Sequence, residues 1–200
     1  IASLSCSGGE ASLIADLAEP LHFRFPKLSS KQKRKLKSAL GDLVHLSNPL
    51  DYQTYVWNDQ VKLTVAFKTM MEETYDFLFI IMDLPKQGRC SSDSWHPAIA
   101  ALKEAKKIAK CPVGLITSLE ENMPEKFAKD LIKHSIIPLT GLENSLAAVK
   151  ALQNVSIQWK IKSTPSIIWE RWPNEKSRVL DEYQSKKVLS RIGINVPKGF

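Results

Sequence analysis

The most constraining feature of this sequence is a run of six residues, 77–82, that is apolar on both faces. A strand with one face in water alternates apolar and polar residues, so an uninterrupted apolar run indicates a strand buried on both sides. Residues 112–117 form a second run, which is apolar up to Thr117. Both runs stand between amphipathic helical patterns, which predicts a parallel sheet with helices on its two faces.

The order of the predicted elements extends this architecture over the chain. Strands are expected at residues 1–4, 21–25, 77–82, 112–117 and 136–139. Helices are expected at about 9–19, from Ser29 or Ser30 to Gly41, from Asn58 or Asp59 through Met71, at 97–109 and 124–134, from Glu143 to about Leu152 or beyond, and at 181–191. Five strands joined by helical crossovers predict an α/β fold, a flavodoxin-like doubly wound parallel five-stranded sheet.

A Gly-Gly turn follows the first predicted strand, within the segment SCSGGEA at residues 5–11. Glycine lets the backbone turn sharply, and the amides of Gly9, Glu10 and Ala11 would then belong to the unpaired first turn of a helix. Unpaired amides and the helix dipole together favour an anion, so the turn predicts a phosphate or carboxylate site. The alternative is that the glycines only close a tight connection between strand and helix.

The carboxyl ends of two predicted strands meet where ligands bind in doubly wound sheets. The Gly-Gly turn follows the first strand and Asp83 follows the strand at 77–82, so both flank the switch point of the sheet. Asp83 also holds the position of the phosphoacceptor in receiver domains. Receivers need an acidic pair after the first strand to hold Mg²⁺, and Ser-Gly-Gly stands there instead. A receiver is therefore the weaker interpretation.

Composition narrows the function classes further. The chain has 200 residues, of which 44% are hydrophobic, enough for a substantial core. Its net charge is +7, but residues 1–157 carry 19 basic and 17 acidic side chains, so we expect no nucleic-acid binding. Three separated cysteines predict neither a disulfide framework nor a metal site. Without a membrane-spanning stretch or a secretory signal, we expect a cytoplasmic protein with no membrane contact.

Three motifs follow one another along the chain: SGGEASLIADLAE from Ser7, NPLD from Asn48 and LDEYQSKKVLSRIGINVP from Leu180. In this order and spacing they resemble the NDP-forming acyl-CoA synthetases, relatives of succinyl-CoA synthetase, over nearly the whole chain. The resemblance implies a succinyl-CoA-ligase-like flavodoxin domain at residues 1–157, a linker or arm at 158–178, and the first helix and strand of an ATP-grasp domain at 179–200. We therefore expect a fragment of a longer enzyme.

The function that the resemblance implies is the formation of acyl-CoA from a carboxylic acid, CoA and ATP or GTP with Mg²⁺, through an acyl phosphate and a phosphohistidine. The histidine belongs to another domain, and none of the four histidines here fits its motif. The implied partners are a CoA-binding Rossmann domain, a phosphohistidine domain and an ATP-grasp domain, and a homo-oligomer is compatible with them. The fragment alone is expected to be inactive and to bind no cofactor.

The resemblance also assigns residues to the site. The positions that it implies to face phosphate are Ser7, Gly8, Gly9, Glu10 and Ala11, while Asn48, Asp51 and Asp83 are candidates for a neighbouring site loop. A carboxylate at Glu10 would repel phosphate, but it can also accept a hydrogen bond from the phosphohistidine ring.

Two alternatives stay open. Cys6, just before the helix, is a candidate nucleophile, although a small buried apolar side chain is the simpler interpretation. The alternative function is a regulatory or scaffold domain of an acetyltransferase fusion, which has kept the fold and lost the chemistry.

Overall fold

A computed structural model describes residues 1–86, 88–161 and 179–197. The chain divides into two units, Ile1–Lys160 and Ile161–Phe200, which we describe separately. Most of the expected linker, residues 162–178, lies outside the described residues. Among the described helices, none is both long enough and apolar enough to cross a bilayer.

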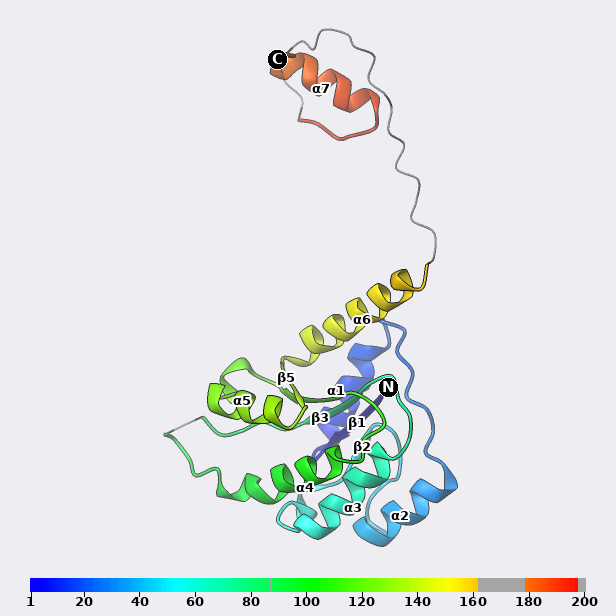
Figure 1. Ribbon diagram of the computed structural model, residues 1–200, viewed down its shortest axis with the longest axis vertical. Coiled ribbons are helices and arrows are strands. Elements are labelled where there is room, and N and C mark those ends of the chain that lie inside the picture. The colour runs from blue at the N-terminus through cyan, green and yellow to red at the C-terminus, as the bar shows by residue number, and fades with distance from the viewer. Residues whose placement is uncertain (87, 162–178, 198–200) are drawn as a thin grey trace. The chain divides into compact units, whose positions relative to one another are not determined.

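The first unit is built on a sheet of five parallel strands in the order β2-β1-β3-β4-β5. The strands are β1 (Ala2–Ser5), β2 (Leu50–Asp51), β3 (Leu78–Ile81), β4 (Val113–Thr117) and β5 (Ile137–Thr140). Every residue of β1, β3 and β4 is buried, as the apolar runs predict for central strands. The predicted fold class, a flavodoxin-like doubly wound parallel sheet, is confirmed (Figure 1).

Helices cover both faces of this sheet. They are α1 (Gly8–Ala18), α2 (Ser30–Leu40), α3 (Gln60–Met71), α4 (His96–Lys106), α5 (Glu125–Lys133) and α6 (Leu142–Trp159). One core packs α1 and α6 on the side chains of Phe79, Ile81 and Ile116, and the larger core packs α2 to α5 on the opposite face, around Leu4 and Ile80. Because alternate residues of each strand point to opposite faces, the central strands contribute to both cores.

Capping side chains start the helices where the sequence predicts. Ser29 and Gln32 form a reciprocal capping box at the start of α2, and Asp59 accepts from the amide of Lys62 at the start of α3. Asp181 caps α7 (Glu182–Arg191), the helix of the second unit. Residues 194–197, where the resemblance implies a strand, have no regular secondary structure.

The predicted second strand, residues 21–25, is wrong. His22 turns the chain with a φ of 58° after α1, and residues 23–25 pair with no strand. Phe23 and Phe25 alternate because they pack against the core beside α1 and α6. The place beside β1 belongs to β2, whose pairing continues in a hydrogen bond of 2.9 Å from the Tyr52 amide to the Ser5 carbonyl.

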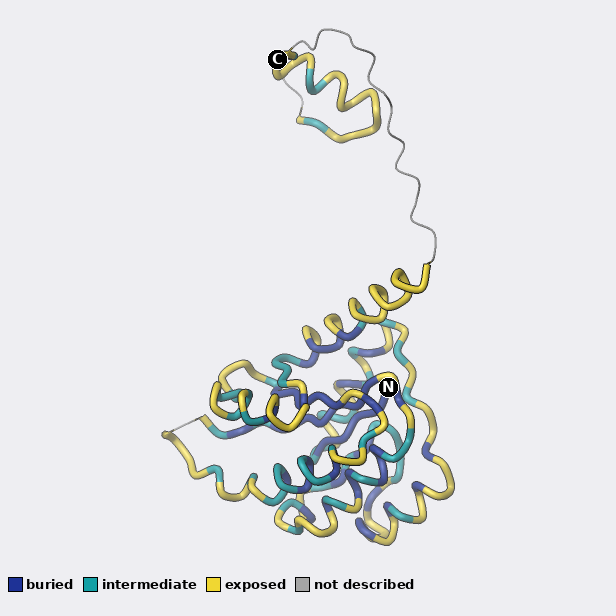
Figure 2. Tube along the Cα trace, in the orientation of Figure 1, coloured by how far each residue is buried: buried dark blue, intermediate teal, exposed yellow. Residues whose placement is uncertain are grey.

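The helix α6 has two halves with different surroundings. Its buried residues are Leu142, Ser145, Leu146 and Val149, all in the first half. From residue 151 to its end every residue is exposed, including Trp159 at 85% (Figure 2). The helix continues seven residues beyond Leu152, as the sequence left open, and it includes the first two residues of the expected linker.

Candidate functional site

The site that the sequence predicts begins where β1 passes into α1. Ser7 is the N-cap in an extended conformation, and its side chain makes no capping bond. The amides of Gly8, Gly9 and Glu10 donate no hydrogen bond to any described residue, whereas the Ala11 amide donates to the Ser7 carbonyl at 3.1 Å. Three amides are therefore available to an anion, and they lie one residue earlier than the sequence suggests.

Asp51 lies directly beside this turn. A methyl group on Gly8 would stand 3.3 Å from Asp51 Oδ2, so the glycine makes room for the carboxylate. Gln53 holds that carboxylate through its amide, 2.9 Å from Oδ1, and through Nε2, 2.6 Å from Oδ2. Gln53 itself has a φ of 67°, a conformation that few non-glycine residues adopt. The strand β2 thus brings a carboxylate to the edge of the predicted anion site.

Glu10 stands half-buried in the first turn of α1. Burial is the main reason that its pKa rises to about 7, and the negative charges of Asp83 and Asp51 raise it further. Its Oε2 atom is buried and has no hydrogen-bond partner among the described residues. None of the ion pairs of the described residues involves Glu10, Asp51 or Asp83. The turn therefore combines anion-binding amides with an acidic surrounding.

Tyr52 is the residue of this site that the sequence analysis missed. Its side chain is fully buried, and its hydroxyl has no partner among the described residues. Burial raises the pKa of Tyr52 well above the usual range, and the charges of Cys6, Glu10 and Asp51 act in the same direction. Its ring stacks on Trp57 at 6.4 Å. The sequence carries no signal for this position, because Tyr52 reaches the site only through the pairing of β2 with β1.

Asp83 holds two loops together at the same edge of the sheet. Its Oδ1 accepts from the Ser118 amide after β4 at 2.7 Å, and its carbonyl accepts from Trp95 Nε1 at 2.6 Å. Trp95 in turn meets Trp57 edge to face, with ring centroids 5.9 Å apart. Asp83 thus acts on Glu10 through its charge while its side chain ties the loop after β3 to the loop after β4.

The side chain of Asn48 makes its hydrogen bonds away from the Gly-Gly turn. Its Oδ1 accepts from the Ser3 amide at 3.2 Å, and its Nδ2 donates to the carbonyls of Ile1 and Pro26. These bonds attach the segment before β2 to β1. Of the three loop candidates, the structure brings Asp51 and Asp83 to Glu10, while Asn48 secures the strand pairing.

The structure also bears on Cys6 as a nucleophile and on metal binding. Burial first, and the charge of Glu10 second, raise the pKa of Cys6 to about 11, so the thiol stays protonated near neutral pH and is a poor nucleophile. Within the described part of the chain, no group of three or more His, Cys, Asp or Glu side chains is arranged to hold a metal ion.

Comparison with known proteins gives likenesses of structure. The sequence matches no protein-family profile and no curated protein. The structure resembles PH0766 from Pyrococcus horikoshii OT3, with a TM-score of 0.61 and 22% identity, over 80% of this chain and 36% of that chain. It also resembles the dinucleotide forming acetyl-coenzyme A synthetase 1 of Ca. Korarchaeum cryptofilum in its apo form, with a TM-score of 0.56 and 16% identity, over 78% of this chain and 33% of that one.

The same synthetase in complex with phosphate and ADP gives a TM-score of 0.56 and 16% identity over 78% of this chain and 32% of that chain. At such identities a likeness shows the fold. The chain thus spans about a third of each of these structures, and it shares with them the fold of a domain found in an acetyl-coenzyme A synthetase.

Proposed function

We propose that the first unit is a domain of an acid–CoA ligase, and that its Gly8–Glu10 turn receives a phosphoryl group carried on a histidine of another domain. The observation that carries this proposal is the set of three unpartnered amides at the start of α1, next to a half-buried carboxyl with an unpartnered oxygen. The motif resemblance and the fold shared with an acetyl-coenzyme A synthetase support it.

The acidic surrounding favours a phosphoryl group on a ring over free phosphate. The amides of Gly8, Gly9 and Glu10 offer donors to phosphoryl oxygens, and the helix dipole adds partial positive charge. The carboxylates of Asp51, Asp83 and Glu10 oppose a free phosphate dianion. A phosphorylated imidazole ring whose second nitrogen is protonated would instead donate that N–H to the Glu10 carboxylate, which has an unpartnered oxygen, and its positive charge would offset part of that repulsion.

The described residues also suggest which reactants this chain binds and which bind to partner domains. Among the described residues, no three His, Cys, Asp or Glu side chains are arranged to hold a metal ion, and the turn uses amides in place of a lysine or arginine. In this proposal the metal, the nucleotide and CoA belong to partner domains, and the ATP-grasp assignment of residues 179–200 rests on the motif resemblance. The contribution of this chain is to orient and stabilise the transferred phosphoryl group.

A binding experiment on the chain tests this function. Titration with monophosphoimidazole, followed by ¹H–¹⁵N NMR, should shift the amides of Gly8, Gly9 and Glu10, and inorganic phosphate should bind more weakly. The variant Glu10→Gln should bring the two Kd values closer together, because an amide is a weaker acceptor than a carboxylate and repels phosphate less. Glu143→Gln, which changes an exposed glutamate in the first turn of α6, is the matched control.

A scaffold domain is the second candidate, favoured by the same acidic surrounding. It predicts that neither probe shifts the amides of the turn in the wild-type chain. That outcome, or an unchanged ratio of the two Kd values in Glu10→Gln, would remove the support for phosphoryl binding.

A further inference from the structure

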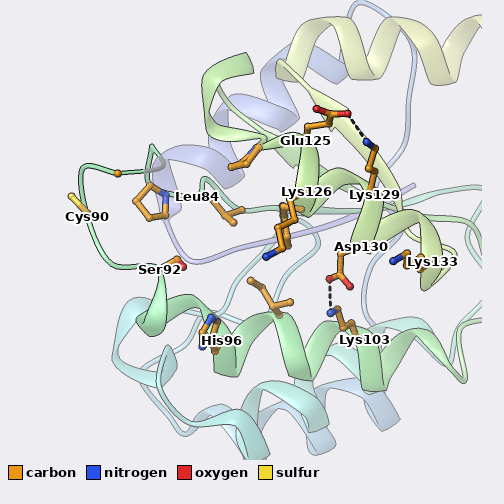
Figure 3. A pocket seen from close by; sticks show the side chains of 15 residues that line it. Leu84, Cys90, Ser92, His96, Lys103, Glu125, Lys126, Lys129, Asp130 and Lys133 are labelled. Carbon is orange, nitrogen blue, oxygen red and sulfur yellow. Dashed lines mark ion pairs between the residues drawn. The ribbon is translucent and has the colours of Figure 1, made fainter.

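A cavity of about 790 Å³ separates α4 from α5, on the face of the sheet opposite α1 (Figure 3). Neighbouring crossover helices in doubly wound folds usually pack against each other. Here α4 buries Ala98, Ala101, Leu102 and Ala105, whereas α5 buries Leu131 alone. Leu84 and Pro85, in the loop after β3, also line the cavity. The volume falls in the range of about 300–1,000 Å³ that is typical of small-molecule pockets.

The lining of the cavity is apolar at its base and basic along one side. Leu84 and Ile99 face the cavity from the loop and from α4, and Phe127 does so from the first turn of α5. Leu84 is only 7% exposed, and the other two are half-buried. Such a surface favours a hydrocarbon or aromatic group over water.

Four lysines line the cavity, and two of them already have acidic partners. Lys103 on α4 pairs with Asp130 on α5 at 2.5 Å, and Lys129 pairs with Glu125 at 2.6 Å. Lys126 and Lys133 form no ion pair with any described residue, which leaves an excess of two positive charges. Lys126 extends from α5 toward α4 (Figure 3).

The start of α5 adds to the preference for an anion. Pro124 is its N-cap and offers no side-chain acceptor, and the amides of Glu125 and Lys126 donate to no described residue. The dipole of this nine-residue helix is therefore directed toward the same end of the cavity as Lys126.

We propose that this cavity binds a small organic anion with an apolar body. The acidic group lies near Lys126 and the start of α5, and the body packs on Leu84, Ile99 and Phe127. The site uses none of the residues of the Gly8–Glu10 turn, so it does not depend on the function proposed above.

Octanoate is a suitable probe because it joins a carboxylate to a hydrocarbon chain. Calorimetry on the full chain should show octanoate binding, and ¹H–¹⁵N NMR should place the shifts on α4, α5 and the loop after β3. Octanol, which has the chain without the charge, and acetate, which has the charge without the chain, should each bind at least tenfold more weakly. Equal affinity for octanol and octanoate would overturn the proposal.

Charge reversal tests the basic side of the cavity. Lys126→Glu with Lys133→Glu should raise the octanoate Kd at least tenfold, whereas Lys31→Glu with Lys33→Glu on the exposed face of α2 should leave it unchanged. An equal loss in both double variants would show a general charge effect and would refute the site.

Filling the cavity gives a second, independent test. Ile99→Trp should abolish octanoate binding without lowering the thermal midpoint, because the ring occupies space that is empty. Retained octanoate affinity in Ile99→Trp would contradict the assignment. Glu10→Gln should leave the octanoate Kd unchanged, so failure of this site and failure of the phosphoryl site give different results.

Discussion

Replacing Glu10 by glutamine should stabilise the protein at alkaline pH and leave its stability unchanged in acid. In the folded chain, burial and the charges of Asp83 and Asp51 raise the pKa of Glu10 from 4.5 to about 7. A carboxyl with a raised folded-state pKa binds its proton more tightly in the folded state than in the unfolded state. The wild-type protein therefore loses stability as pH rises from about 4.5 to 7, and the loss is complete above that range.

The size of this loss follows from the shift. One pKa unit corresponds to about 1.4 kcal/mol, so a rise from 4.5 to about 7 gives an upper limit of about 3.5 kcal/mol. Glu10 is only half-buried, so solvent screening reduces this figure. Below pH 4 the glutamine amide meets the same unpartnered surroundings as the protonated carboxyl, so the two side chains are about equal there. We expect a net gain of about 1 kcal/mol above pH 8, and none below pH 4.

Urea unfolding of the wild type and of Glu10→Gln at pH steps from 4 to 9 measures this difference. The midpoint of the variant should exceed that of the wild type increasingly between pH 5 and 8, with equal m-values. Glu143→Gln should show no such rise, because that glutamate is exposed. A difference that stays constant from pH 4 to 9 would refute the assignment of a raised pKa to Glu10.

Four further substitutions probe the same edge of the sheet. Gly9→Ala should raise the free energy of unfolding by about 0.5–1 kcal/mol, because the added methyl group meets nothing closer than 3.5 Å. Gly8→Ala should raise it less, because its methyl group would stand 3.3 Å from Asp51 Oδ2. Equal gains of the two variants in urea unfolding would contradict this reasoning. Tyr52→Phe should stabilise by about 1 kcal/mol by removing an unpartnered buried hydroxyl, and a destabilisation would show that the hydroxyl has a partner in solution. Asp83→Asn should lower the pKa of Glu10 as followed by NMR, since Asp83 is the larger of its two charged influences, and an unchanged pKa would contradict that influence.

The central sheet could be predicted from the sequence because burial on both faces leaves a strong local signal. The runs at 77–82 and 112–117 became β3 and β4, and Ser29 and Asp59 marked helix starts through local bonds. The second strand could not be predicted in this way. β2 has two residues, too few for any periodicity, while the alternation at Phe23 and Phe25 reflects packing without strand pairing.

The candidate site, like the fold, was predictable where it depends on neighbouring residues and unpredictable where it depends on distant ones. The Gly-Gly turn depends on neighbouring residues, so its place and its helix start were predictable from residues 5–11. The approach of Asp51 and Tyr52 depends on the pairing of β2 with β1, which joins residues more than 40 positions apart. The acidic surrounding of Glu10 depends on that pairing and on Asp83, and it supports the proposal of a phosphoryl group on a ring over free phosphate.

The two halves of α6 should also differ in how fast their amides exchange with deuterium. Amides up to Val149 lie in a segment that packs on the sheet, so they open only with larger unfolding events. Beyond it, the exposed turns to Trp159 have only their own helical bonds, and an isolated helix of that length is marginal in water. We expect protection to fall sharply after Val149, with the terminal turns exchanging within the fastest class of helical amides in the first unit.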